Sequence, residues 1–369
     1  MDNDGMRIGT VTLRSAGPLA FGPDGILFLA DSVGATVFAV DIADEGTPAG
    51  ATPLDLNDID IRVGALLGCD AGDIAIRDVA VHPISGNVYL SVQRGRGELA
   101  QAVLVRIDRL AGDISDVALS DVPHAAVTID DAPAEDDGRL DITLPLDDEG
   151  ELIEVGQRKI RILRRPIRTS TITDIAFVDG TLLVAGLSNE EFSSKLRRIP
   201  YPFAAAGASA TVANNLEIFH VSHGKWETAA PIRAFVSYEG GRSILATYTC
   251  TPLVHFSLSQ LEPGTKTIGR TVAELGAVNQ PLDMVSFMQD AEEKLLVANS
   301  SHGLLKLSIR DIDAQTALTE PTEPVGVPRT VEDLQGVSRL ANLGPDHVLL
   351  LQTDDEGRQH LRSLATTAL

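Results

Sequence analysis

Oxygen-bearing side chains flank several apolar, strand-like runs of the sequence. Three aspartates stand close to the start of such runs, and two asparagines follow others: Asp78, Asp174, Asp283, Asn189 and Asn299. Hard cations such as Ca²⁺ bind about six to eight oxygen ligands, so this set could contribute to a divalent metal site. An aspartate at the head of a strand can instead accept hydrogen bonds from nearby backbone N–H groups, and that structural role is the alternative.

Two arginines accompany these carboxylates. Arg77 directly precedes Asp78, and Arg233 stands at the start of another strand-like run. A guanidinium group can bind a carboxylate or phosphate through two parallel hydrogen bonds, so both arginines could hold an anionic substrate. They could equally neutralise the aspartates. In a hydrolytic site, Asp78 or His302 is the candidate general base, and Arg77 and Arg233 would bind the substrate.

Histidine and cysteine residues offer two other combinations. His220 and His223 lie in FHVSHGKWE, with Glu227 four residues further on. The segment reads as a strand, in which residues three apart face opposite sides, so shared metal binding is not expected. Thiolate and imidazole groups can form a soft-metal or redox site, although no typical ligand spacing is present. That alternative group consists of Cys69, Cys250 and His302.

Composition limits the classes of partner. The chain has 369 residues and a net charge of −22, which disfavours binding to nucleic acid or to an anionic membrane surface. It has no apolar run long enough for a transmembrane helix. Residues Met1–Asp4 are acidic and carry no signal-peptide pattern. A periplasmic or secreted location is expected only if a signal peptide has been removed, and the compartment and oligomeric state stay open.

One pattern occurs six times along the chain. Each copy has an apolar run, a turn rich in Gly, Asp or Asn, a second apolar run, a polar loop and a third strand. Such units cannot bury their faces alone and must stack around an axis. The six units are Leu19–Val40, Asp78–Ile107, Thr173–Ile199, Ile232–Leu258, Pro281–Ile309 and Gly336–Leu364.

Most neighbouring units begin about 50 to 60 residues apart, on the order of a long propeller blade. We therefore expect an all-β, six-bladed β-propeller that forms one domain over residues 1–369. The acidic and then basic stretch Ala111–Ser170 is either an insertion, which we favour, or a degenerate seventh blade. Strand Arg7–Arg14 is expected to close the ring against the C-terminal blade. Short helical turns are expected within Leu258–Leu275 and Thr330–Leu334.

Two segments resemble a known blade motif. PLAFGPDGILFLADS and DVAVHPISGNVYLSV are similar to blades of NHL-repeat and gluconolactonase (regucalcin-type) propellers, and GLSNEEFSSKLRRIPYPF and YTCTPLVHF resemble segments of bacterial proteins. The resemblance implies that residues before the first strand and after the second strand of each blade meet at one mouth of a central channel. It would bring the candidate site residues, Cys69 and Cys250 included, to that face.

The resemblance also implies a metal site at the mouth. Gluconolactonase-like enzymes hold a divalent ion there through carboxylates and an asparagine. The matching ligands here would be Asp174, Asp283, Asn189 and Asn299, with Ca²⁺ or a similar ion. The early Glu of the family, in an E-G-P context, is replaced in this chain by Ala16-Gly17-Pro18.

Two classes of function follow. We favour a binding platform for a small molecule or a partner protein at the channel mouth, with or without a metal. Its surface would include loops Ser188–Ser194 and Thr249–Pro252 and the acidic insertion. The alternative is a metal-dependent hydrolase for a lactone or ester, in which the ion polarises the carbonyl and activates water. An ion with an open coordination position would indicate the enzyme, and a mouth of paired Asp and Arg would indicate the platform.

Overall fold

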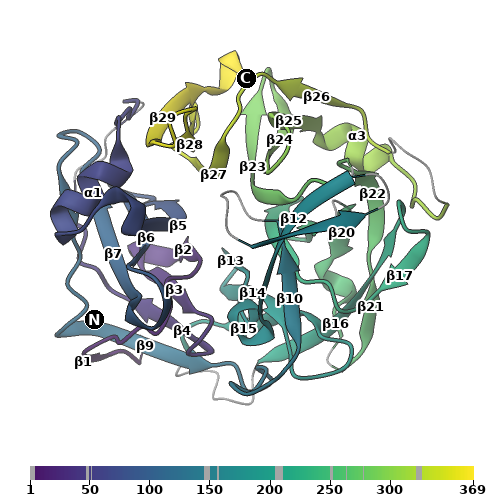
Figure 1. The fold of residues 1–369 in the computed structure, drawn as a ribbon, viewed down its shortest axis with the longest axis horizontal. Coiled ribbons are helices and arrows are strands. Elements are labelled where there is room, and N and C mark those ends of the chain that lie inside the picture. The colour runs from purple at the N-terminus through teal and green to yellow at the C-terminus, as the bar shows by residue number, and fades with distance from the viewer. Residues whose placement is uncertain are drawn as a thin grey trace.

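β-sheets arranged around a common axis make this protein a β-propeller (Figure 1). The computed structural model describes residues 5–46, 50, 52–144, 150–155, 158–203, 211–249, 252–262, 264–276, 278–320 and 326–369. Within these residues, the three strands predicted for each repeat unit form the inner part of one sheet, which confirms the repeat pattern. We number the six sheets by the order of their units in the chain.

Hydrogen-bonded neighbours follow one another across each of the first three sheets. The first sheet consists of β1 (Arg7–Gly9), β9 (Val122–Thr128), β4 (Thr36–Val40), β3 (Leu27–Asp31) and β2 (Leu19–Phe21). The second consists of β5 (Ile74–Val81), β6 (Val88–Arg94), β7 (Gln101–Ile107) and β8 (Ile114–Asp116). The third consists of β13 (Asp174–Val178), β14 (Thr181–Leu187), β15 (Ser194–Pro200), β16 (Val212–His220) and β17 (Lys225–Glu227), with β21 (Lys266–Ile268) parallel to β16.

The remaining sheets have three or four strands each. The fourth consists of β18 (Ile232–Tyr238), β19 (Ser243–Tyr248), β20 (Pro252–Ser257) and β22 (Arg270–Glu274). The fifth consists of β23 (Pro281–Gln289), β24 (Glu292–Asn299), β25 (Leu304–Ser308) and β26 (Arg329–Glu332), and the sixth of β27 (Val337–Asn342), β28 (His347–Thr353) and β29 (Gln359–Ala365). A separate sheet, the insertion sheet, consists of β10 (Leu140–Thr143), β12 (Arg158–Pro166) and β11 (Glu151–Val155).

Helices are few in the described residues. They are α1 (Ile59–Leu67), α3 (Ile309–Ala314) and the 3₁₀ turns η1 (Pro23–Gly25), η2 (Ala71–Asp73), η3 (Gly97–Leu99), η4 (Ile167–Ser170), η6 (Leu258–Gln260) and η7 (Thr366–Ala368). None of them is long and apolar enough to span a membrane. The short helical turn expected within Leu258–Leu275 is confirmed as η6, which is followed by β21 and β22. The turn expected within Thr330–Leu334 is wrong, because this segment begins in β26.

The ring closes in an order that differs from the order of the chain. Each innermost strand contacts two others, in the cyclic order β2, β5, β27, β23, β18 and β13. A hydrophobic cluster fills each of these contacts between neighbouring sheets. The second sheet therefore lies between the first and the sixth, and the first lies between the second and the third. Runs such as β3, in which every residue is buried, supply this packing.

The N-terminal strand does not close the ring, so this prediction is wrong. β1 pairs with β9 in the first sheet, with Arg7 opposite His124. The outer side of the sixth sheet is instead covered by the segment between the first two units. Leu56 forms a two-bond antiparallel bridge with Leu361 of β29, at 3.0 and 2.9 Å. This pairing shields a strand edge that would otherwise be exposed.

The stretch Ala111–Ser170 has three structural parts. β8 extends the second sheet, and β9 lies between β4 and β1 in the first. The insertion sheet comes last, and Figure 1 shows β10 and β12 crossing the face of the ring near its centre. Its strands match the expected strands at Asp141–Leu146 and Lys159–Leu163 approximately.

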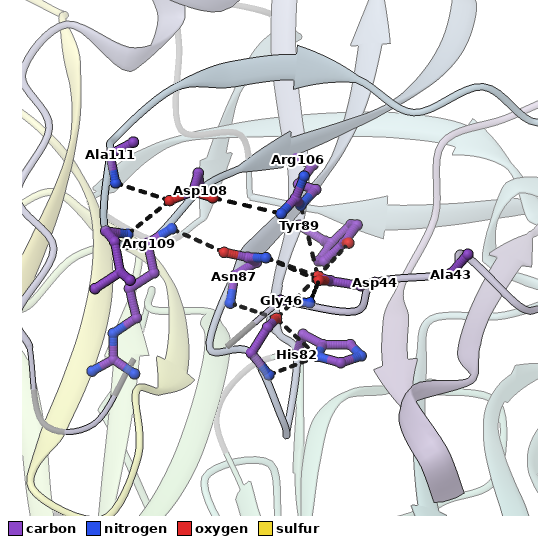
Figure 2. A network of polar contacts seen from close by, with 12 residues as sticks. Ala43, Asp44, Gly46, His82, Asn87, Tyr89, Arg106, Asp108, Arg109 and Ala111 are labelled. Carbon is purple, nitrogen blue, oxygen red and sulfur yellow. Dashed lines mark hydrogen bonds and ion pairs between the residues drawn. The ribbon is translucent and has the colours of Figure 1, made fainter. Parts of the chain in front are cut away.

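A buried polar network joins the loop after β4 to the second sheet (Figure 2). The Asp44 carboxylate accepts hydrogen bonds from the side chains of Ser85 (3.0 Å), Asn87 (2.9 Å) and Tyr89 (2.8 Å). The His82 ring is buried beside it and accepts the Ser85 backbone N–H at 3.0 Å. These contacts give His82 a structural role.

Candidate functional site at the channel mouth

β-Bulges in four inner strands direct side chains toward one region. Register shifts leave Arg77, Arg233, Leu282 and Ser338 without direct cross-strand partners in β5, β18, β23 and β27. A bulge bends the strand and changes the direction of the extra side chain. Two adjoining cavities of about 230 and 620 Å³ lie here, and Arg77 and Leu282 line both.

Arginines supply nearly all the charged side chains in the described lining of these cavities. Arg77, Arg165 and Arg339 line both cavities, Arg233 lines the smaller and Arg96 the larger. Among the described lining residues, the smaller cavity has no acidic side chain and the larger has only Asp60. The remaining lining is mostly small, hydroxylated or amide-bearing, and it includes Ser32, Thr143, Thr173 and Gln280. The mouth is therefore locally cationic.

Arg233 is neutralised by the insertion sheet. Its guanidinium nitrogens lie 2.7 and 2.9 Å from the two carboxylate oxygens of Asp141 in β10, and only 9% of its side chain is exposed. A hydrogen bond from the Leu144 backbone N–H to the Gln280 side chain, at 2.9 Å, adds a second link. These contacts hold β10 over the channel mouth. Arg233 therefore neutralises a carboxylate, as the alternative interpretation expected, but that carboxylate belongs to Asp141 and not to Asp78, Asp174 or Asp283.

The other arginines make contacts of different kinds. Arg77 donates to the Gln93 side chain at 3.0 Å, and Arg339 donates to the carbonyl oxygens of Arg77 (2.5 Å) and Ser338 (2.6 Å). Among the described residues, the guanidinium of Arg165 has no hydrogen-bond or ion-pair partner. Arg165 is partly buried on β12 and lines both cavities. It is the guanidinium best placed to meet a ligand.

The three predicted aspartates share one structural arrangement. One oxygen of each accepts the backbone N–H of the next residue, and the other accepts a backbone N–H from a neighbouring inner strand. The donor pairs are Val79 and Leu19 for Asp78, Ile175 and Phe235 for Asp174, and Met284 and Leu340 for Asp283, all at 2.7–2.9 Å. The carboxylates therefore join β5 to β2, β13 to β18 and β23 to β27, which links all six inner strands in pairs.

Burial and mutual repulsion change the protonation of these carboxyls. Burial raises the pKa of Asp283 to about 7, with a further contribution from the charge of Asp78 and an opposing one from Arg339. Burial, with the charges of Asp283 and Asp78, raises the pKa of Asp174 well above its usual value. Burial also raises the pKa of Asp78, against the effect of Arg339. At neutral pH these groups thus carry less than three full negative charges.

The other predicted site residues lie apart from the described cavity linings. Asn299 is buried, where its side chain accepts a hydrogen bond from Asn279 (2.9 Å) and donates one to the Val297 carbonyl (2.8 Å). Asn189 and His302 lie in exposed loops. The metal-ligand set Asp174, Asp283, Asn189 and Asn299 stays a prediction, as do the catalytic roles assigned to Asp78, His302, Arg77 and Arg233.

The cysteine group is described only in part. Cys69 follows α1, is half-buried as a free thiol, and donates its backbone N–H to the Gly64 carbonyl. Cys250 lies outside the described residues, with part of loop Thr249–Pro252. The soft-metal or redox group of Cys69, Cys250 and His302 stays a prediction.

The expected geometry of His220 and His223 is wrong. The chain turns between β16 and β17, with a backbone hydrogen bond from Gly224 to Val221, so the two imidazoles meet. Their Nδ1 atoms lie 3.4 and 3.6 Å from the same Glu227 oxygen. In the described part of the chain, these two histidines and Glu227 are the one group of potential metal-binding side chains that lie close enough together to hold an ion. The Gly224 after VSH was the available signal for this turn.

Sequence reasoning also missed Arg165, Arg339 and Asp141. Arg339 directly follows the bulge in β27, and Asp78 and Asp283 directly follow the bulges in β5 and β23, so the three positions are equivalent. An alignment of the six units on their inner strands would have shown it. Arg165 stands in the basic segment KIRILRRPIR, but no repeat relates the insertion sheet to the mouth.

No protein-family model and no curated protein matches the chain. Solved structures that resemble it include the PQQ-bound aldose sugar dehydrogenase of Streptomyces coelicolor, at 11% identity, TM-score 0.40 and 98% coverage of both chains. Streptogramin B lyase has 9% identity, TM-score 0.35 and 96% coverage of both chains. A candidate 6-phosphogluconolactonase of Bacteroides uniformis has 11% identity and TM-score 0.35, with 98% of this chain and 78% of that chain covered. Likeness at this level does not define a function.

Proposed function

We propose that the protein is a binding module for a small anionic molecule, carrying a carboxylate or phosphate, at the channel mouth. The observation that carries this proposal is the lining of the cavities by Arg77, Arg165 and Arg339 in a chain whose net charge is −22. Guanidinium groups bind carboxylate and phosphate oxygens through charge-assisted hydrogen bonds. A cleft of one sign of charge also concentrates ligands of the opposite sign.

The protonation of the inner aspartates supports the proposal. Their raised pKa values mean that Asp174 and Asp283 only partly offset the positive charge of the arginines at neutral pH. The same positive charge disfavours a divalent cation at the mouth. This is why a binding module is our proposal, and a gluconolactonase-like, metal-dependent hydrolase is the alternative with less support.

The size and lining of the cavities narrow the class of ligand. Pockets for small molecules commonly measure about 300–1,000 Å³, and the two adjoining cavities together fall in this range. The hydroxyls of Ser32, Thr143 and Thr173 and the Gln280 amide could bind hydroxyl groups of a ligand. A polyhydroxylated acid or a sugar phosphate would use both kinds of group.

Titration calorimetry with three probes tests the proposal: inorganic phosphate, citrate and 6-phosphogluconate. We expect at least one of them to bind the wild-type protein, with an affinity that falls as salt rises. Arg165→Ala should weaken that binding about 10- to 150-fold, because a hydrogen bond to a charged group contributes about 1.5–3 kcal/mol.

Arg164→Ala is the matched control. Arg164 is the neighbour of Arg165 on β12, points to the opposite side of the strand, and pairs with Glu151 at 2.6 Å in an exposed position. It should bind the probes as the wild type does. The proposal is refuted if no probe binds, or if the two variants lose equal affinity.

A further inference from the structure

The hairpin formed by β16 and β17 brings two imidazoles and a carboxylate together at the outer edge of the third sheet. We propose that this hairpin binds one divalent transition-metal ion, with Zn²⁺ the best match, through Nδ1 of His220, Nδ1 of His223 and a carboxylate oxygen of Glu227. This site is separate from the channel mouth and does not depend on the function proposed for it.

The spacing of the ligand atoms fits tetrahedral coordination. Zn²⁺ bonds to nitrogen and oxygen at about 2.0–2.2 Å, so two ligands of a regular tetrahedron lie about 3.4 Å apart. The Glu227 oxygen lies 3.4 Å from Nδ1 of His220 and 3.6 Å from Nδ1 of His223. All three ligand atoms lie within 4.8 Å of one another, so side-chain rotations can bring them around one ion. Two imidazoles and one carboxylate suit Zn²⁺ better than Ca²⁺ or Mg²⁺, which prefer sets of oxygen ligands.

A buried carboxylate lies close to one of the ligands. Glu274 of β22 is 2% exposed, and its Oε2 lies 3.8 Å from Nε2 of His220, whose side chain is 1% exposed. The backbone N–H of Val221 (2.8 Å) and the hydroxyl of Ser222 (3.2 Å) donate to Glu274 and fix its position. A carboxylate at Nε2 favours the tautomer with the proton on that nitrogen, which presents the lone pair of Nδ1 to a metal ion.

The site can be reached from solvent. The side chain of His223 is 47% exposed, so water could fill the fourth coordination position. The Lys225 ammonium lies 3.3 Å from the Glu227 oxygen that would bind the ion, and its side chain is 60% exposed. Metal binding would displace this ammonium into solvent. Little stability would be lost, because exposed ion pairs contribute little.

Metal titration of EDTA-treated, dialysed protein tests the site. Zn²⁺ should bind the wild type with one equivalent in calorimetry, and Co²⁺ should give the visible absorption of a tetrahedral complex. His223→Ala should weaken Zn²⁺ binding at least about 100-fold, and Glu274→Gln about 10- to 100-fold. Affinity should fall as the pH is lowered, because protonated imidazoles cannot bind the ion.

Lys225→Met is the matched control on the same hairpin. It keeps all the ligands and removes the competing ammonium, so it should bind Zn²⁺ as tightly as the wild type or more tightly. Circular dichroism establishes that each variant is folded, and the exposed position of His223 makes His223→Ala the decisive one. The proposal is overturned if folded His223→Ala binds Zn²⁺ as the wild type does, or if Co²⁺ shows only the spectrum of the hydrated ion.

Discussion

Removing the carboxylate of Asp174 should destabilise the ring, whether or not a metal binds at the mouth. The two oxygens accept the backbone N–H groups of Ile175 and Phe235, both at 2.8 Å, and both of these residues are buried. In Asp174→Ala the two donors have no protein acceptor. Each buried, unpaired donor costs about 1–3 kcal/mol, so the expected loss of unfolding free energy is about 2–6 kcal/mol. The alanine avoids the burial of a carboxyl, which favours the lower half of this range.

Urea denaturation in the presence of EDTA measures this loss without any contribution from bound metal. Thr173→Ala is the control, because the neighbouring Thr173 hydroxyl has no hydrogen-bond partner among the described residues. That variant should lose less than about 1 kcal/mol. A loss below about 1 kcal/mol for Asp174→Ala would refute the structural role assigned to this carboxylate.

The pH dependence provides a second readout of Asp174. Burial raises its pKa, so between about pH 4 and the raised value the folded state retains a proton that the unfolded chain has released. This contribution to stability therefore decreases as the pH rises. The difference between the wild type and Asp174→Ala should therefore be larger at pH 5 than at pH 7. A difference that grows with pH would contradict the raised pKa.

Two other substitutions test the polar contacts that hold the loops. Asp44→Ala removes the acceptor of Ser85, Asn87 and Tyr89 and should cost about 3 kcal/mol in urea denaturation at pH 7. Burial alone would raise the pKa of Asp44, but these hydrogen bonds lower it, so the difference from wild type should shrink as the pH falls below about 4. Asp141→Ala leaves the Arg233 guanidinium buried without its carboxylate and should cost about 3–5 kcal/mol. A double-mutant cycle with Arg233→Met should recover part of this loss, and two strictly additive losses would show that the pair is not coupled.

Local patterns were sufficient to predict the three inner strands of each repeat unit. The run LFLAD is buried at every position and forms β3, and the turn at Pro23–Gly25 separates β2 from β3 as its composition predicts. Each of the six units repeats this pattern of strands and turns, and the six repeats together predicted the all-β fold class. The head-of-strand aspartates also fulfil the structural alternative, because both oxygens of each accept backbone N–H groups.

The order of the sheets and the composition of the mouth could not be predicted in the same way. Which inner strands are neighbours depends on contacts between strands far apart in the chain, such as β5 with β27. The cationic lining includes Arg165, whose insertion sheet is held at the mouth by the pairing of Asp141 with Arg233 and by the hydrogen bond from Leu144 to Gln280. None of these contacts has a local signature. The sequence analysis treated the segment with His220 and His223 as one continuous strand and placed the two side chains on opposite faces. The turn between β16 and β17 brings them together instead.

The distribution of charge connects the ring to the proposed ligand. Inner strands that pack side by side leave backbone N–H groups that need acceptors, and Asp78, Asp174 and Asp283 supply them. Full ionisation of three neighbouring, partly buried carboxyls would be costly, and their raised pKa values reflect this. Because their negative charge is reduced, these carboxyls only partly cancel the charge of Arg77, Arg165 and Arg339 at the mouth. Because the carboxyls are partly neutral and arginines line the cavities, an acidic protein can have a cationic pocket at its centre. An anion bound there would contact guanidinium groups and not these carboxyls.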